Sequence, residues 1–287
     1  MKKIALISPS SPTQALTPET LAQLKDIFDR MGYHLHLGSH ALDAVRHLAG
    51  TDADRAADVM RAFTDDEIDV VMSVRGGSGS PRILDLLDYN LLSRHKKPFL
   101  TLSDGTALQT ALYTKAGHSG YSGIIGLNFL EPENQALVAE AARLLNGEKP
   151  HIPIKKILRP GRTEGICIGG NLSVLTGLIG TPYLPDMTGK ILLIEDVNEY
   201  PYRLERLLAQ WRLGGLLDQV AGVILGTFGD QTDRYGGTSQ DVLNDYFGTF
   251  DRPVVQVDYG HGPHTVLMPI GRTIRLDTQR PLIEEVE

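Results

Sequence analysis

Apolar runs alternate with helical segments through the first half of the chain, and this alternation is what most restricts the fold. The stretch IDVVMSV at 68–74 is apolar almost throughout, as expected of a strand covered on both faces of a parallel sheet. Other strands are predicted at 3–8, 33–38 and 98–102. Helices are predicted between or after them, at 18–31, 52–66, 80–95 and 104–116. Strands separated by helices of this length are typical of βαβ units and predict a parallel sheet.

The second half repeats this kind of pattern after an interruption. Residues 147–165 carry three prolines and three glycines, which is typical of a connection between elements. Beyond it the pattern predicts helices at 171–179 and 201–213 and strands at 190–196, 220–228, 253–260 and 272–278. We therefore predict an α/β protein of two domains, with the active site in the cleft between them. The expected parts are an N-terminal parallel sheet flanked by helices at 1–150, a linker at 151–165 and a smaller C-terminal α/β domain at 166–287.

Composition narrows the class of partner. The chain is 41% hydrophobic and 22% charged, which is ordinary for a soluble globular protein. A net charge of −7 argues against a nucleic-acid partner or an anionic membrane, because both require a basic face. Cys167 is the single cysteine, so no disulfide forms within the chain. The first apolar run is too short for a secretion signal, and no run approaches the length of a membrane span, so we expect a cytoplasmic protein.

Ser103 and Asp104 stand where the strand at 98–102 passes into a helix. Taken alone, these residue types predict a polar cap on the helix. The stretch Thr101-Leu102-Ser103-Asp104-Gly105 is also the nucleophile elbow Gly-x-Ser-x-Gly with threonine in place of the first glycine. An elbow directs the N–H of Asp104 and the helix dipole toward an oxygen that becomes negative during attack.

A glycine-rich turn, VRGGSGSPRILDLL at 74–87, is a second candidate site. It lacks the third glycine of the dinucleotide fingerprint and the lysine of the P-loop. What remains is a run of backbone N–H groups able to face an oxyanion or a phosphate. The plain alternative is a tight turn that needs glycine for its dihedral angles.

A carboxylate and a histidine in the second half of the chain are further candidates for a site. The strand at 190–196 ends on Glu195 and Asp196, and His261 lies between glycines after another strand. Acids are common at strand ends because they reach water there, yet a carboxylate in this place can also orient a histidine. His261 and His264 have the His-x-x-His spacing, but no third ligand is near, so we predict no metal site. Serine, carboxylate and histidine are the three members of a hydrolytic triad.

With these residues in view, the chain resembles the LD-carboxypeptidases, also called muramoyltetrapeptide carboxypeptidases. The resemblance spans nearly the whole chain. It is carried by several long motifs in the same order: ISPSSP, LAGTDADRAADVMRAF, VRGGSGSPRILDLLDY, PFLTLSDGTAL, GICIGGNLSVLTGLIGTPYLP, LLIEDVNEYPYRLERLL and GHGPHTVLMPIG. It implies a serine peptidase without metal or cofactor. Such enzymes act in the cytoplasm on peptides recycled from peptidoglycan and release D-alanine from an L,D-bond.

Carried over to this chain, the resemblance implies a catalytic triad of Ser103, Glu195 and His261. It implies an oxyanion hole formed by the N–H groups of Asp104 and Gly77, and a homodimer. A carboxypeptidase must also bind a free carboxylate, for which Arg75 and Arg203 are both candidates. Asn171 either lines the cleft or caps a helix.

The chain departs from the family pattern beside the expected site. Ser78 stands where the family usually has tyrosine, and Thr101 and Leu102 replace a glycine followed by an aromatic residue or histidine. These changes leave the triad intact and bear on the substrate pocket. They leave room for a self-immunity peptidase that cleaves a peptide–nucleotide antibiotic such as a microcin. A non-catalytic two-domain protein that binds a small ligand is the alternative from another class.

Overall fold

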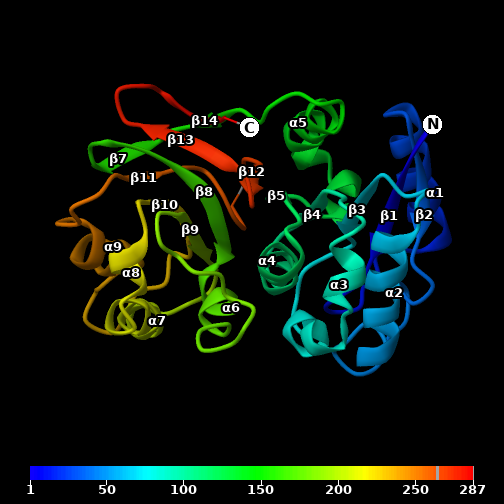
Figure 1. Ribbon diagram of the computed structural model, residues 1–287, viewed down its shortest axis with the longest axis horizontal. Helices are drawn as coiled ribbons and strands as arrows, with labels where there is room; N and C mark the ends of the chain where they lie inside the picture. Colours follow the sequence, from blue (N-terminus) through cyan, green and yellow to red (C-terminus); the bar gives the residue numbers. More distant parts are fainter. Residues whose placement is uncertain (263–264, 287) are drawn as a thin grey trace. The chain divides into compact units, whose positions relative to one another are not determined.

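The computed structural model describes residues 1–262 and 265–286, which form two compact units (Figure 1). The first unit is Met1–Glu148 and the second is Lys149–Glu287. Each unit has a sheet of its own with helices packed against it, so the protein has the expected two-domain α/β fold. The two units are described in turn.

The first unit is built on parallel strands, as the alternating pattern predicts. Strand β1 pairs with both β2 and β3, and the sheet continues from β3 through β4 to β5. The strands are β1 (Lys2–Ile7), β2 (Tyr33–Leu37), β3 (Val70–Ser73), β4 (Phe99–Thr101) and β5 (Gly120–Ser122). Because they run parallel, the carboxyl ends of β1, β3 and β4 lie next to one another at one edge of the sheet.

The helices of this unit begin where the sequence places their caps. Thr17 and Thr51 each accept a hydrogen bond from the third residue of the following helix, forming capping boxes. The helices are α1 (Pro18–Arg30), α2 (Asp52–Thr64), α3 (Tyr89–Leu92), α4 (Gly105–Ala116) and α5 (Gln135–Leu145). Short 3₁₀ segments are η1 (Ser80–Leu86), η2 (Gly126–Leu130) and η3 (Pro132–Asn134).

The single helix predicted over 80–95 is wrong in one respect. The chain forms the 3₁₀ segment η1 and then a separate short helix, α3. Asp88 causes the break, because its carboxylate accepts a hydrogen bond from the N–H of Leu91 and starts a new helix.

The second unit has a mixed eight-stranded sheet in the order β6-β14-β13-β8-β9-β10-β11-β7. Its centre, from β8 to β11, is parallel, and antiparallel strands flank it on both sides. The central strands are β8 (Arg162–Asn171), β9 (Ile191–Asp196), β10 (Gly222–Phe228) and β11 (Val254–Gln256). The other strands of this sheet are β6 (Ile152–Pro153), β7 (Lys156–Arg159), β13 (Thr273–Asp277) and β14 (Leu282–Glu285). The short strand β12 (Met268–Ile270) is not part of this sheet.

Residues 151–165, expected to form a linker, belong to this sheet instead. They form β6, β7 and the first residues of β8. Both β6 and β7 are edge strands, where proline is tolerated because one side of the strand makes no ladder hydrogen bonds. The prolines that indicated a connection therefore mark the edges of a sheet.

The helices that the structure describes beside the second sheet lie grouped together in Figure 1. They are α6 (Leu172–Thr176), α7 (Pro201–Leu213), α8 (Leu216–Gln219) and α9 (Ser239–Phe247). Helix α7 has the predicted bounds and carries Trp211, which is fully buried and donates its indole N–H to Thr176. Among the residues that the structure describes, no helix is both long and apolar enough to cross a membrane.

Gly105 is required by the way β4 joins α4. A β-carbon at this position overlaps the hydroxyl of Thr101, which is itself buried and hydrogen-bonded to Ser73 at 2.7 Å. We expect Gly105→Ala to lower the free energy of unfolding by about 1–3 kcal/mol, the usual range for an overpacked interior. Urea unfolding measures this. In a Thr101→Gly background the same change should cost much less, and an equal cost in both backgrounds contradicts this explanation.

Candidate active site

Ser103 occupies a strained turn between β4 and α4. Its φ is +63°, in the left-handed region that residues other than glycine rarely adopt. The side chain of the residue at the start of α4 makes no capping hydrogen bond, and the helix itself begins at Gly105. The cap expected from this stretch alone is therefore wrong, and the turn has the sharp strand-to-helix form of a nucleophile elbow. Such backbone strain costs about 1–3 kcal/mol and is typically found at functional sites.

The residues around Ser103 are buried while Ser103 itself is partly exposed. Thr101 is fully buried, and Leu102 and Asp104 are 7% and 3% exposed. Thr101 and Leu102, which depart from the family pattern, thus lie beneath the turn and not on an open surface. Of the three departures, only Ser78 is exposed.

The glycine-rich turn after β3 passes directly beside Ser103. A β-carbon added at Gly76 falls 2.7 Å from the β-carbon of Ser103, so only glycine permits this approach. Gly77 has a φ of +123°, and a side chain there overlaps Ser11. Both glycines are thus required by the packing. Their N–H groups belong to the segment that the sequence proposes for an oxyanion.

Arg75 and Ser78 flank these glycines, and both make hydrogen bonds with the segment that follows β1. The Arg75 guanidinium donates to the backbone oxygens of Gly76 and Pro12, each at 3.2 Å. The N–H of Ser78 donates to Ser11 Oγ at 3.1 Å, and the Ser78 side chain is exposed. Arg75 retains further N–H donors for a carboxylate, so its proposed binding role stays a prediction.

Glu195 and His261 form a close pair in the second unit. Glu195 lies near the end of β9 and is fully buried, and its Oε2 is 2.8 Å from Nδ1 of His261. Gly260 permits the approach, because a β-carbon there falls 2.6 Å from the same Oε2. Since Nδ1 faces the carboxylate, Nε2 is the nitrogen left to exchange a proton with another group.

Asn171 holds Glu195 in place. Its side-chain N–H₂ donates to Glu195 Oε1 and to Asp196 Oδ1, both at 3.1 Å, while its oxygen accepts from Val174 N. It is 4% exposed, so it caps α6, as the plainer interpretation predicts, and also orients the carboxylates. These hydrogen bonds explain the burial of Asn171 without a contact to substrate, and its proposed place in the cleft stays a prediction.

Burial and the neighbouring acids act on the pKa of His261 in opposite directions. Burial is the largest single influence and lowers its pKa. The hydrogen bond to Glu195 and the negative charges of Glu195 and Asp196 outweigh burial and raise the pKa above the ordinary value. Burial also raises the pKa of Asp196 to about 6, against hydrogen bonds from Val197, Asn171 and Ser173 that lower it. The contact between Glu195 and His261 therefore favours an imidazolium beside a buried carboxylate.

Arg203, the other candidate for binding a carboxylate, lies in the first turn of α7. Its side chain is 54% exposed, its Nε donates to the hydroxyl of Tyr202 at 3.1 Å, and Nη1 is 3.9 Å from Glu199. These weak surface contacts leave it available, and its role also stays a prediction. His264 lies outside the described residues.

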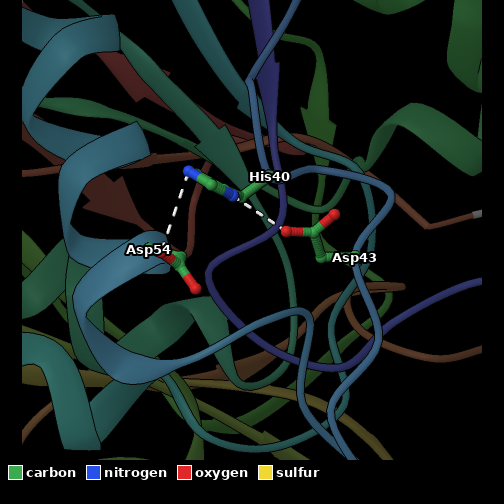
Figure 2. A group of neighbouring side chains, drawn as sticks. All are labelled: His40, Asp43 and Asp54. Atoms are coloured by element: carbon green, nitrogen blue, oxygen red, sulfur yellow. Dashed lines mark hydrogen bonds and ion pairs between the residues drawn. The ribbon is translucent and has the colours of Figure 1, made fainter.

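A cluster of His40, Asp43 and Asp54 has the chemistry of a metal site (Figure 2). Nδ1 of His40 is 2.8 Å from Asp43, and Nε2 is 3.8 Å from Asp54. The hydrogen bond to Asp43 is the main reason that the pKa of His40 is raised; the charges of Asp54 and Asp58 add to it, and burial opposes it. Figure 2 shows the ring lying between the two carboxylates, an arrangement that suits an imidazolium linking the loop after β2 to the start of α2. Because each ring nitrogen already faces a carboxylate, we give this cluster a structural role.

Comparison with known proteins agrees with these units. Residues 4–123 match the LD-carboxypeptidase N-terminal domain, and residues 164–276 match the LD-carboxypeptidase C-terminal domain. The chain belongs to the LD-carboxypeptidase family. Membership confirms the resemblance carried by the sequence motifs and supports a serine peptidase of the carboxypeptidase type.

Individual LD-carboxypeptidases and their relatives match over nearly the full length. A probable murein peptide carboxypeptidase of Bacillus subtilis is 33% identical over 96% of this chain and 88% of its own. The crystal structure of a muramoyltetrapeptide carboxypeptidase from Oxalobacter formigenes has a TM-score of 0.87 at 26% identity, covering 98% of this chain and 97% of that one. The microcin C7 self-immunity protein MccF of Escherichia coli is 26% identical over 96% of this chain and 90% of its own.

The sequence did not predict the polar groups that hold the turns after β1, β3 and β4. Ser10 and Ser80 are buried and hydrogen-bonded to Asp104, and the buried Arg55 donates to backbone oxygens of Pro9 and Gly79. No sequence signal predicts these contacts, because the partners are 24 to 94 residues apart along the chain. The motif ISPSSP marks the segment but not what it binds.

We expect the imidazole of His261 to titrate with a midpoint above the ordinary value of about 6.5. Glu195→Gln should lower that midpoint, because it removes the adjacent charge that favours the imidazolium. Proton NMR of the histidine ring measures both. Glu205→Gln, at an exposed position on α7, is the control and should leave the midpoint unchanged. An unchanged midpoint in Glu195→Gln contradicts the assignment.

Proposed function

We propose that this protein is a serine LD-carboxypeptidase that releases terminal D-alanine from L,D-linked muramoyl tetrapeptides in cell-wall recycling. The observation that carries the proposal is the left-handed backbone of Ser103, partly exposed on a strand-to-helix turn. A fold tolerates such strain where the hydroxyl must be presented in a fixed direction. The Glu195–His261 pair is the second support, because it supplies a base with a defined free nitrogen.

The first half of the reaction forms an acyl-enzyme. Nε2 of His261 takes the proton of Ser103 as Oγ attacks the carbonyl carbon of the L,D-bond. The N–H groups of Asp104 and Gly77 stabilise the negative oxygen of the tetrahedral intermediate. When the intermediate collapses, His261 gives its proton to the nitrogen of the departing D-alanine, and an ester to Ser103 remains.

The second half returns the enzyme to its starting state. His261 takes a proton from water as the water oxygen attacks the ester, and then returns that proton to Ser103 Oγ as the Oγ–carbon bond breaks. The Glu195 carboxylate faces Nδ1 of the imidazole and stabilises each imidazolium. The steps need no metal ion or cofactor, because a base and two N–H donors supply the chemistry.

The substrate remains part of the proposal. The names of the Bacillus and Oxalobacter relatives support a peptide from murein. Arg75 or Arg203 is proposed to bind the terminal carboxylate, since a guanidinium donates two parallel hydrogen bonds to such a group. The family resemblance further suggests a homodimer in the cytoplasm, and light scattering of the purified protein tests the dimer.

A second candidate substrate follows from Ser78. This exposed residue replaces the usual tyrosine next to Gly77, and a smaller side chain leaves more room beside the reacting bond. The similarity to MccF supports an acyl-linked peptide–nucleotide antibiotic as the alternative. The fold, triad and mechanism would be the same.

We expect the purified protein to release one D-alanine from a muramoyl tetrapeptide with a chelator present, while Ser103→Ala releases none. Loss of a triad serine costs on the order of 10⁶-fold in kcat in a serine peptidase. Mass spectrometry of the peptide measures the product. Ser93→Ala, an exposed serine after α3, is the control and should keep full activity. Equal release by Ser103→Ala contradicts the proposed nucleophile. Release by neither protein favours the antibiotic-type substrate.

We expect kcat/KM to rise with pH and to level off above the pKa of His261. The sign follows from the mechanism, because only the neutral imidazole accepts the proton of Ser103. Since Glu195 raises that pKa, the midpoint should lie above about 6.5. Initial rates from pH 5 to 9 measure it. A rate that falls through this range contradicts His261 as the base.

A further inference from the structure

The carboxylate of Asp104 is buried among neutral donors. Its Oδ2 accepts a hydrogen bond from Ser10 Oγ at 2.6 Å and another from the N–H of Ser80 at 2.7 Å. Ser80 Oγ donates in turn to the backbone oxygen of Asp104 at 2.5 Å. These three residues are each at most 3% exposed. Within the described part of the chain, no lysine or arginine forms an ion pair with Asp104. Burial of a polar group is costly unless it is hydrogen-bonded, so the two donors to Oδ2 are what hold this side chain in place.

The hydrogen bonds of Asp104 join three turns at one edge of the sheet. Ser10 belongs to the segment after β1, Ser80 ends the glycine-rich turn after β3, and Asp104 follows Ser103 after β4. The strands β1, β3 and β4 are neighbours in the sheet, so the three turns lie side by side. One carboxylate oxygen thus fixes the distances among all three turns.

Other contacts hold the far side of the glycine-rich turn. Ser78 N donates to Ser11 Oγ, and the guanidinium of Arg55 donates to the oxygens of Pro9 and Gly79. The three residues that follow Gly77 are therefore each held by a hydrogen bond. Of their partners, only Asp104 is also covalently next to Ser103.

We propose that the Asp104 side chain positions the oxyanion hole, a role that rests on the proposed function. The backbone N–H of Asp104 serves as one donor to the oxyanion. Its carboxylate, through Ser80, holds the turn that carries the other donor, on Gly77. One residue thereby fixes both donors relative to Ser103 Oγ. Catalytic groups must be held to within about 0.5 Å of their working geometry, so loss of this link should slow the chemical step.

The experiment compares Asp104→Ala, Asp104→Asn and Ser10→Ala with the wild type. The probe is a fluorophosphonate, which reports on the nucleophile whatever the natural peptide. Ser103 Oγ attacks phosphorus, the P–F bond breaks, fluoride leaves, and the Oγ proton passes to His261. The phosphoryl oxygen then occupies the oxyanion hole. The rate constant of labelling is measured alongside urea unfolding, and kcat and KM are measured on the peptide.

We expect Asp104→Ala to slow labelling by about 10²–10³-fold, as loss of one oxyanion donor does. Asp104→Asn should recover most of this rate, because an amide oxygen also accepts both hydrogen bonds. Ser10→Ala should fall between the two, since Ser80 still donates to Asp104. On the peptide, kcat should fall with KM nearly unchanged. Should the Ala variant fail to fold, Asp104→Asn and Ser10→Ala still decide the question.

Ser8→Ala is the matched control. Ser8 is buried in the same segment, but its hydroxyl donates to the backbone oxygen of Ala41 and not to Asp104. It should lose a comparable buried hydrogen bond and keep the wild-type labelling rate. Equal slowing in Ser8→Ala and Asp104→Ala overturns the positioning role, as does wild-type labelling of Asp104→Ala. Equal slowing of the Asn and Ala variants overturns it too, because charge would then matter and not acceptance.

Other outcomes would contradict the proposed function. If the wild type is not labelled, or if Ser103→Ala is labelled equally, the nucleophile is wrong and both proposals fall. If labelling is normal but no D-alanine is released, only the substrate is wrong and the test of Asp104 stands.

Discussion

The left-handed turn at Ser103 is the constraint on which the first unit's site depends. Holding a serine at a φ of +63° costs about 1–3 kcal/mol of backbone strain, which the surrounding contacts must offset. Three features of the packing favour this turn. Gly76 and Gly105 remove side chains that collide with the turn, Thr101 fills the space beneath it, and Asp104 ties it to its neighbours. A hydroxyl presented in one fixed direction is the result.

The second unit depends on a different interaction, the contact between the buried carboxylate of Glu195 and the imidazole of His261. Glu195 has no exposed surface, yet His261 and the amide of Asn171 occupy its two oxygens. Gly260 and Gly226 let other backbone approach it closely, since a β-carbon at Gly226 falls 2.9 Å from that of Glu195. The glycines that the sequence shows around His261 thus serve close packing as well as freedom of the loop.

The sequence predicts most of the elements because their signals are local. Helix α7 starts at Pro201 as expected, and the apolar runs of β1 and β3 lie in a parallel sheet. Edge strands such as β6 and β7 are missed because they are short and contain or adjoin proline. Their pairing with distant strands, not their own composition, makes them strands.

The candidate site could be predicted in part for the same reason. Ser103, Glu195 and His261 stand in motifs that the sequence shows directly. The choice between a cap and a strained turn at Ser103 could not be made, because both use the same residues and differ only in a dihedral angle. The contacts of Asp104 with Ser10 and Ser80 depend on which strands become neighbours, which no local pattern contains.

The proposed mechanism requires His261 to take the proton of Ser103. The most direct test is the rate at which a fluorophosphonate labels the wild type and His261→Ala, with the adduct mapped by peptide mass spectrometry. We expect an adduct on Ser103 and a labelling rate about 10²–10⁴-fold lower without the imidazole, the usual contribution of a general base. Labelling of His261→Ala at the wild-type rate, or an adduct on another residue, would contradict it.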